Sequence, residues 1–449
     1  MSKTQNRQTM KKILILVIIL FYTEAGFATD HDAIDIHGFI TQGYLKTDHN
    51  DFIAETEDGS FEFNEMGLNF NKRLSDGLDF SLQFFAYDFG GLGNDRIAIN
   101  HAGVSYYVNQ QFTFRAGKSK VSYGLYGDSR DMDMLRTFVL LPQGVYTEAF
   151  RDSIHSAKGF EIYGSGYPEP LKFMEPLGEF YYKIQYGIMD IPKDSGVSHV
   201  LAMTLHTDPE ESTSDTSYNL VLGWETPVPG LRLQGQYSEY GVFLSGKTFD
   251  DEFWDEIKIQ AIDQLYPDLS QDLKNAISSA VIIGDMPVSY SGDVSMYIIG
   301  AEFTWRGLTL AAEQVFFNMK YKTRIKYKAA GEDSVFDYTF ENPTLGYYYM
   351  GSYQISDWLK IGGYYTVYYP DKDNKKGGGG TNLGNPDYFA WQKDSCIAAR
   401  FDLSPNSIFK IEGHYIDGGA QLDYVKPLDD YSKTHRYWYL FAAKLSYNF

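Results

Sequence analysis

Charged side chains crowd the stretch between residues 118 and 158, which carries six basic and five acidic residues in an otherwise apolar and aromatic context. These residues are Lys118, Lys120, Asp128, Arg130, Asp131, Asp133, Arg136, Glu148, Arg151, Asp152 and Lys158. The apolar residues between them, such as Leu140, Leu141 and Tyr146, are too many for an exposed loop, so we expect the stretch to pack against the rest of the chain. Fixed charges act strongly on passing ions where little water screens them. The stretch is therefore our candidate for a selectivity element, although its nearly cancelling charges indicate no preference for anions or cations.

The sequence gives less support for a catalytic site or a metal site than for a selectivity element. His101 and Ser105 share one face of a predicted strand, but a lipase site needs a nucleophile motif and an orienting group, and the sequence has no recognisable motif of that kind. His37, His101 and His414 lack metal-ligand spacing, so we interpret them as pore-lining residues. The single cysteine, Cys396, excludes an intrachain disulfide and a cysteine cluster and is expected to be inert. We expect no enzyme activity, no cofactor and no metal site.

The C-terminal residues 437–449 carry the clearest structural signal. Their apolar face consists of Tyr437, Tyr439, Phe441, Ala443, Leu445, Tyr447 and Phe449. The opposite face includes Lys444, Ser446 and Asn448. Such period-two alternation predicts a half-buried strand. A strand that ends on phenylalanine in this way resembles the terminal strand of outer-membrane barrels, which the barrel-assembly machinery reads.

The same alternation recurs along the whole chain. It predicts strands near residues 34–46, 60–72, 78–89, 96–108, 111–119, 157–164, 179–189, 216–226, 231–241, 292–305, 308–328, 342–355, 358–370, 391–403, 407–418 and 435–449. Even-numbered strands mostly lead into short turns and odd-numbered strands into longer polar connections, with the long connection 165–178 as an exception. This is the topology of a transmembrane barrel with short periplasmic turns and long external loops. We therefore predict an all-β fold, a transmembrane antiparallel β-barrel of about sixteen strands.

Two connections stand out. The strand order makes residues 120–156 the third external loop, which we expect to form a constriction by folding into the lumen. Residues 242–291 are predicted to be a partly helical external loop, because apolar residues recur every four positions in 251–265 and a second amphipathic pattern follows in 270–280. A separate binding domain in this region is the less favoured alternative.

The first 28 residues are predicted to be a cleaved signal peptide. Four basic residues precede an apolar run of ten residues, 13–22, and Gly26-Phe27-Ala28 fits a signal-peptidase site. The run is too short to be a transmembrane helix, which needs about 20 residues. Residues 29–449 would then form the barrel. The net charge of −20 argues against nucleic acid as a partner.

Alternation also predicts which wall side chains face the lumen. The basic ones are Arg115, Lys183, Arg232, Arg400, Lys410 and Lys444, and the acidic ones are Asp35, Glu65, Asp79, Glu179, Glu225, Glu302, Glu313, Asp402 and Glu412. We interpret them as a balanced lumen in which Arg400 pairs with Asp402 or a carboxylate on a neighbouring strand. The alternative is a row of basic side chains along the lumen that would bind anions in succession. The tyrosines in 347–349 and 364–369 are assigned to interface girdles, with sugar stacking in the lumen as the alternative.

Along nearly the whole predicted mature chain, the sequence resembles Gram-negative outer-membrane porins, and within them the phosphate-selective-porin-like group and its uncharacterised relatives. The residues that carry this resemblance are 36–44 (IHGFITQGY), 115–126 (RAGKSKVSYGLY), 129–131, 141–143, Tyr146, 399–403 and 410–418. The resemblance implies a homotrimeric, sixteen-stranded channel in the outer membrane whose third loop folds inward. Outer-membrane lipid and lipopolysaccharide would surround it.

The resulting hypothesis is a porin that forms a water-filled channel for passive diffusion of small hydrophilic solutes or ions. A substrate-selective channel, for a phosphate-type anion or a sugar, is the alternative. Phosphate selectivity needs clustered cations, whereas carboxylates are interspersed among the cations here. A barrel-embedded, lipid-modifying enzyme is the third hypothesis.

Overall fold

The computed structural model describes residues 33–151, 156–167, 169–189, 191–192, 195–196, 198, 207–249, 259, 262–263, 266–280, 286–329, 332–377, 386–422, 424 and 431–449. The predicted signal peptide lies outside the described residues, as does most of the helical pattern predicted in 251–265. Within these ranges, none of the helices has the length and apolar character needed to cross a membrane.

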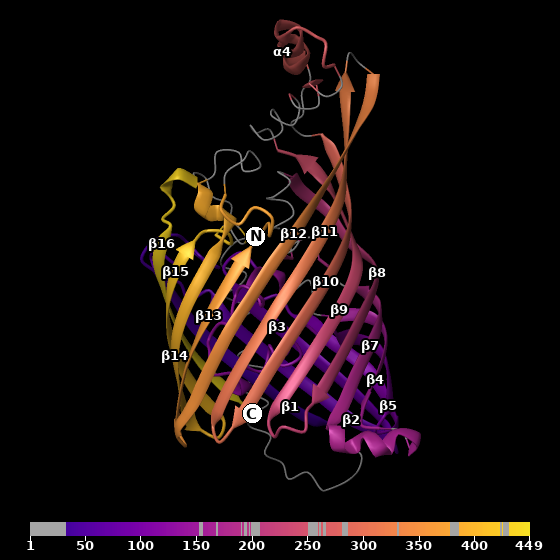
Figure 1. Ribbon diagram of the computed structural model, residues 1–449, viewed down its shortest axis with the longest axis vertical. Helices are drawn as coiled ribbons and strands as arrows, with labels where there is room; N and C mark the ends of the chain where they lie inside the picture. Colours follow the sequence, from indigo (N-terminus) through magenta and orange to yellow (C-terminus); the bar gives the residue numbers. More distant parts are fainter. Residues whose placement is uncertain are drawn as a thin grey trace.

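Sixteen antiparallel strands form one closed barrel (Figure 1). They are β1 (Asp35–Thr47), β2 (Phe63–Ser75), β3 (Leu78–Phe89), β4 (Ala98–Asn109), β5 (Phe112–Lys120), β6 (Ser156–Ser165), β7 (Glu179–Met189), β8 (Thr207–Glu225), β9 (Leu231–Thr248), β10 (Pro287–Trp305), β11 (Leu308–Ala329), β12 (Glu332–Ser356), β13 (Leu359–Tyr369), β14 (Gln392–Ser404), β15 (Ser407–Gly418) and β16 (Tyr437–Asn448). Each strand pairs with its sequence neighbours, and β1 closes the barrel on β16, with Ile40 opposite Tyr447. The predicted fold class is confirmed, and every predicted strand is present.

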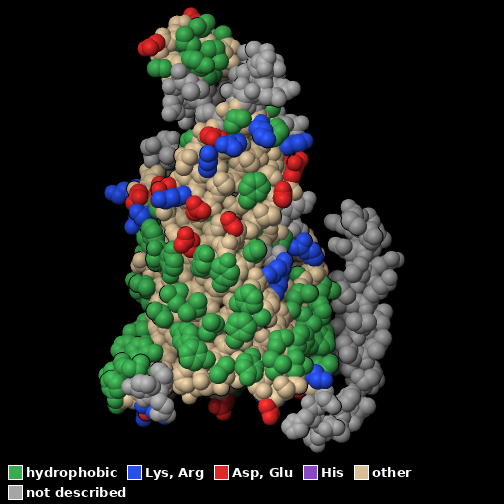
Figure 2. Space-filling model, turned by 90° about the vertical axis from the view of Figure 1, so that its right-hand side faces the viewer, with side chains coloured by type: hydrophobic (Ala, Val, Ile, Leu, Met, Phe, Trp, Pro, Cys, Tyr) green, Lys and Arg blue, Asp and Glu red, His purple; other side chains and the backbone are tan. Residues whose placement is uncertain are grey.

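The wall is apolar outside and polar inside, because consecutive side chains of a strand point to opposite faces. In β16, Tyr439 and Phe441 are exposed, whereas Lys444 and Ser446 on the opposite face are buried. Figure 2 shows hydrophobic side chains covering a broad band of the outer surface, with charged side chains above and below it. This band is what a lipid-facing wall requires.

The predicted assignment of the tyrosine-rich stretches to interface girdles holds for only part of them. Tyr349 and Tyr365 point outward, with 63% and 40% of their surfaces exposed. Tyr348, Tyr364 and Tyr368 are buried on the inner side. The alternation of each strand therefore divides its tyrosines between the lipid face and the interior.

The two ends of the barrel differ in their connections. The end that holds the C-terminus has short turns (Figure 1), such as Arg306-Gly307, where both residues have the positive φ angles of a two-residue hairpin. The β6–β7 connection at this end is longer and contains the 3₁₀ helix η3 (Glu169–Leu177). The other end carries the longer connections, including helix α4 (Gln271–Ala280), which confirms the helical pattern predicted in 270–280.

Two predicted loops are shorter in the structure. Strand β9 continues to Thr248 and β10 begins at Pro287, so both ends of the predicted loop 242–291 belong to strands. Strand β12 begins at Glu332, whereas the predicted strand began at residue 342, so only residues 330–331 separate β12 from the end of β11. In this extension Arg324 lies opposite Asp337 and forms a salt bridge with it at 2.9 Å. Cross-strand ion pairs of this kind stabilise the part of the β11–β12 hairpin that extends beyond the apolar band.

Candidate functional site

The connection between β5 and β6 turns into the barrel instead of extending away from it. We call residues 121–151 of this connection the inner segment. Residues 136–149 are all buried, and the inner segment forms hydrogen bonds or salt bridges with inward-facing side chains of β2, β9, β11, β13, β15 and β16. Asp152, the remaining predicted site residue of this loop, lies outside the described residues.

Buried salt bridges hold one side of the inner segment to β2 and β16. The Arg151 guanidinium contacts Glu65 of β2, Asp131 at 3.1 Å and Glu148 at 3.4 Å. Lys444 of β16 contacts the same Glu65 carboxylate. Charges without water are tolerated only when they are paired and hydrogen-bonded, so these contacts fix the place of the segment.

Asp133 is the second centre of this network. Its carboxylate lies 2.9 Å from Arg136, 3.0 Å from the Lys410 ammonium of β15 and 2.6 Å from the Ser446 hydroxyl, which donates a hydrogen bond. Burial alone would raise the pKa of Asp133, but Lys410, Lys444 and Arg136 outweigh it and hold the pKa well below its ordinary value. We call the whole network the ionic anchorage: Glu65, Asp131, Asp133, Arg136, Glu148, Arg151, Lys410 and Lys444.

A different contact holds the inner segment to β11 and β12. The Glu313 carboxylate of β11 accepts hydrogen bonds from the Tyr146 hydroxyl, from the Tyr348 hydroxyl of β12 at 2.6 Å and from the Leu125 amide at 2.7 Å. The hydrogen-bond donors to Glu313 in the described part of the chain are all uncharged. We call Leu125, Tyr146, Glu313 and Tyr348 the tyrosine anchorage.

The middle of the inner segment lies against β12, β13 and β15. The Glu412 carboxylate of β15 accepts hydrogen bonds from the Val139 amide at 2.7 Å and the Leu140 amide at 2.8 Å. The Gly144 amide donates to the Thr366 hydroxyl of β13 at 3.1 Å. A Cβ atom on Gly346 of β12 would lie 1.7 Å from the Gly144 carbonyl oxygen. Glycine at position 346 therefore permits direct contact between the segment and the wall.

The other predicted site residues also form close pairs. These pairs are Arg115–Glu161 at 2.9 Å, Lys120–Asp131 at 2.5 Å, Arg130–Glu148 at 3.2 Å, Lys183–Asp128 at 2.8 Å, Arg232–Glu302 at 3.0 Å and Arg400–Asp402 at 2.6 Å. The predicted pairing of Arg400 with Asp402 is thus confirmed. The structure gathers these charges into pairs, and the side chain of Asp128 keeps 54% of its surface exposed.

Lys118 is placed differently from the prediction. It shares the face of β5 that carries the exposed Phe112 and Phe114, and its partner in the register is Lys158, which is exposed on the same face as Phe160 of β6. The charge count had grouped Lys118 with the lumen residues by its place in the sequence. The parity of the strand turns it to the outside.

Several residues of the site were missed because the sequence reasoning followed charges. Asn100 donates to Asp131 at 2.8 Å, and Gln236 of β9 donates to the Ser122 carbonyl and accepts from the Gly124 amide. Glu161 was not named either, although it is buried beside Arg115. Strand alternation could have placed Gln236 and Glu161 on the inner face of the wall. It does not reveal which atoms these side chains contact.

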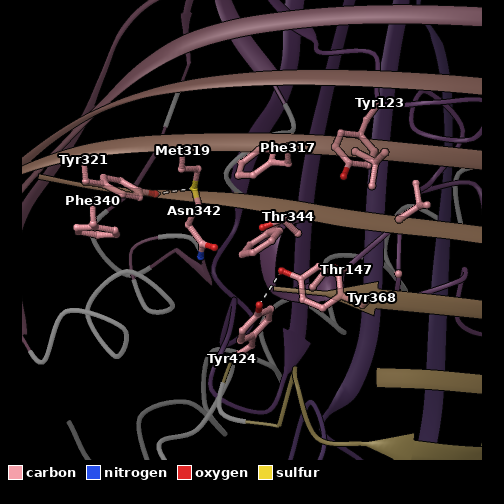
Figure 3. Close-up of a pocket in the computed structure, with 14 residues that line it drawn as sticks. Tyr123, Thr147, Phe317, Met319, Tyr321, Phe340, Asn342, Thr344, Tyr368 and Tyr424 are labelled. Carbon is pink, nitrogen blue, oxygen red and sulfur yellow. Dashed lines mark hydrogen bonds between the residues drawn. The ribbon is translucent and has the colours of Figure 1, made fainter. Parts of the chain in front are cut away.

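A small aromatic pocket of about 60 Å³ lies between the inner segment and strands β11 to β13 (Figure 3). Its ring-bearing residues are Tyr123, Phe150, Phe317, Tyr321, Phe340, Tyr368 and Tyr424. The Tyr368 and Tyr424 hydroxyls lie 2.7 Å apart, and Asn342 and Thr344 add polar atoms to the lining. The pocket therefore combines aromatic faces with hydrogen-bonding groups at its edge.

Comparison with solved structures identifies the architecture. OmpT, an outer-membrane protein of Vibrio cholerae, is 11% identical, with 94% of this chain and 99% of that chain covered and a TM-score of 0.52. OmpF of Salmonella typhi in complex with daunomycin is 15% identical, with the same coverage and a TM-score of 0.51. This chain has the fold of an outer-membrane β-barrel. No family model matches it, and no curated protein matches it. The narrower resemblance to phosphate-selective porins stays a prediction.

Proposed function

We propose that this chain is a channel for small solutes in the outer membrane of a Gram-negative bacterium, and that the inner segment sets the width of the passage. The observation that carries this proposal is the fixation of one segment to well-separated parts of the wall. Arg151 contacts Glu65 on β2, whereas Tyr146 contacts Glu313 on β11. A segment held at both places lies across the route that a solute would take through the barrel.

The pairing of the charges supports weak ion selectivity in preference to a phosphate-type channel. Arg130, Arg136 and Arg151 each lie within 3.4 Å of a carboxylate. An anion that loses its hydration needs positive charge that is not already neutralised by the protein. These arginines are also buried, so they offer no free positive charge to such an anion, and the arrangement favours general diffusion.

The aromatic pocket favours a second candidate, a channel for sugars. Aromatic faces such as those of Tyr321 and Phe340 bind apolar faces of ring solutes, while Asn342 and Thr344 offer hydrogen bonds. Both candidates are channels, and they differ in whether a neutral ring solute occupies a saturable site.

Planar-bilayer recording of the purified chain tests these functions. We expect stepwise conductance with a small reversal potential in a salt gradient. Saturable block by a disaccharide would favour the sugar channel, and a reversal potential close to ideal anion selectivity would favour the phosphate-type channel. Absence of conductance steps, together with phospholipid hydrolysis in detergent, would replace the channel by the enzyme hypothesis.

The role of the inner segment is tested by Gly346→Ala. The added Cβ atom would overlap the Gly144 carbonyl oxygen, so the segment must leave the β12 wall. We expect a larger and noisier single-channel conductance. Gly351→Ala on the same strand is the matched control, because a Cβ atom there meets only the Leu310 side chain at 3.3 Å and a backbone oxygen at 4.0 Å. Equal conductance in both variants and the unmodified chain would show that the segment does not set the width.

A further inference from the structure

We propose that Cys396, Glu412 and His414 form a binding site for a zinc-like divalent transition-metal ion on the inner wall. Cys396 of β14 lies directly opposite His414 of β15 in the strand register. Glu412 is two residues before His414 and shares its inward face. Each of the three residues is only 3% exposed, and one ligand atom from each lies within 4.8 Å of the others.

The donor set fits zinc-like ions. Thiolate sulfur, imidazole nitrogen and carboxylate oxygen are the three ligand types that Zn²⁺ takes in proteins. Tetrahedral coordination at the usual bond lengths separates ligand atoms by about 3.3 to 3.6 Å. His414 Nε2 and Glu412 Oε1 already lie 3.1 Å apart, so binding an ion between them needs little movement. The Cys396 thiol, and Nε2 if it is protonated, would release their protons to solvent on binding.

The surroundings of His414 match those of a metal ligand. Its Nδ1 atom lies 3.0 Å from the Asp394 carboxylate. A carboxylate in this position fixes the ring with Nε2 directed towards Glu412 Oε1, at the place where the ion would bind; a carboxylate on the other ring nitrogen is the usual arrangement around metal-bound histidine. The Tyr364 hydroxyl is a second, independent indication of a ligand site beside Cys396. Tyr364 is 5% exposed and pairs with Cys396 in the β13–β14 register. Its hydroxyl interacts with the Cys396 thiol but has no hydrogen-bond partner of normal geometry among the described residues.

The position of the site links it to the inner segment. The Glu412 carboxylate that would bind the ion also accepts the Val139 and Leu140 amides. A bound ion would therefore tie β14 and β15 to the middle of the inner segment through one carboxylate. The single cysteine, which the sequence predicts to be inert, would be the ligand that distinguishes this site from ordinary carboxylate sites for hard cations.

Cobalt titration of the full chain, purified in detergent without a histidine tag, tests the proposal. Co²⁺ replaces Zn²⁺ in such sites, and a thiolate–cobalt bond gives a charge-transfer absorption band. Because the chain has one cysteine, any such band reports on Cys396 alone. We expect one equivalent of Co²⁺ to produce the band and Zn²⁺ to abolish it by displacement. Zn²⁺ should also slow alkylation of Cys396.

Variants separate the site from adventitious binding. Cys396→Ser and His414→Asn should lower the Co²⁺ affinity by more than about 100-fold, and Asp394→Asn by about 10- to 100-fold with the band retained. His101→Asn, on β4, is the control and should leave affinity and band unchanged. Binding without the band, equally strong in Cys396→Ser, would assign the ion to surface carboxylates and overturn the proposal. The proposal would also be overturned if the unmodified chain showed no band with Co²⁺ and no change in the rate of Cys396 alkylation with Zn²⁺. This second test does not depend on the folding of any variant.

Discussion

The inner segment is fixed to the barrel by two kinds of contact. At the ionic anchorage, full charges from the segment and from β2, β15 and β16 neutralise one another, as Arg151 does with Glu65. At the tyrosine anchorage, one carboxylate, Glu313, accepts hydrogen bonds from uncharged donors. Both anchorages are buried, and they lie on separate parts of the closed barrel.

The difference between charged and uncharged contacts predicts how a substitution in each anchorage affects the protein. Removal of one cation from the ionic anchorage leaves the buried carboxylates with an excess of negative charge, which is more costly than an unused hydrogen-bond donor. Neutralisation of Glu313 leaves uncharged donors with fewer acceptors. The ionic anchorage should therefore determine the stability of the interior, and the tyrosine anchorage the mobility of the inner segment.

The largest effect is expected for Arg151→Met. Each of the three carboxylates that contact Arg151 loses one cation: among the described residues Glu65 keeps its contact with Lys444, Asp131 with Lys120 and Glu148 with Arg130. We expect the free energy of unfolding to fall by about 3–5 kcal/mol, measured by thermal unfolding in detergent. Arg73→Met is the matched control, because Arg73 pairs with Asp79 while 69% of its side chain is exposed. Equal losses in the two variants would contradict the assignment of Arg151 to a buried network.

A smaller effect is expected for Glu313→Gln. The amide oxygen accepts fewer hydrogen bonds than the carboxylate, and its NH₂ group opposes a hydroxyl donor. We expect a loss of about 1–3 kcal/mol and increased current noise, because Tyr146 is held less firmly while the ionic anchorage stays intact. Glu341→Gln, on the exposed part of β12, is the control. A larger loss of stability than in Arg151→Met would reverse the order of the two anchorages.

The sequence predicted the wall better than the interior, and the reason is physical. Alternation is local, so β16 and the inward parity of Glu65 and Lys410 were visible in the chain. The end of β9 and the start of β12 were missed because polar residues, such as Lys247 and Asp337, interrupt their outward faces beyond the lipid band. The contact of Glu65 with Arg151 depends on the path of the inner segment, whereas its contact with Lys444 depends on closure of the barrel by β1 between β2 and β16. Cys396 and His414 meet only through the β14–β15 register, which no spacing within one strand reveals.

The smallest effect on stability is expected at a pair that belongs to neither anchorage, Asp128 and Lys183. Partial burial raises the pKa of Asp128, but Lys183 and the Ser122 hydroxyl outweigh it, so the pKa lies below its ordinary value. A carboxyl with a lowered pKa stabilises the folded state above its ordinary pKa of about 3.9, and this contribution is lost as the pH falls through the lower, folded-state value.

Asp128→Asn should therefore cost at most about 1 kcal/mol at neutral pH, since half-exposed pairs are screened by solvent. The reversal potential in a salt gradient should shift towards anions, because Lys183 loses its counter-charge at an accessible place in the lumen. Both differences from the unmodified chain should shrink in acid, once Asp128 itself is protonated. Asp263→Asn removes a carboxylate of similar exposure beside Lys274, next to α4 and outside the barrel strands, and should leave the reversal potential unchanged. A shift of equal size in both variants would mean that selectivity arises from the overall charge of the external end, and neither the paired lumen nor its anchorages would then explain it.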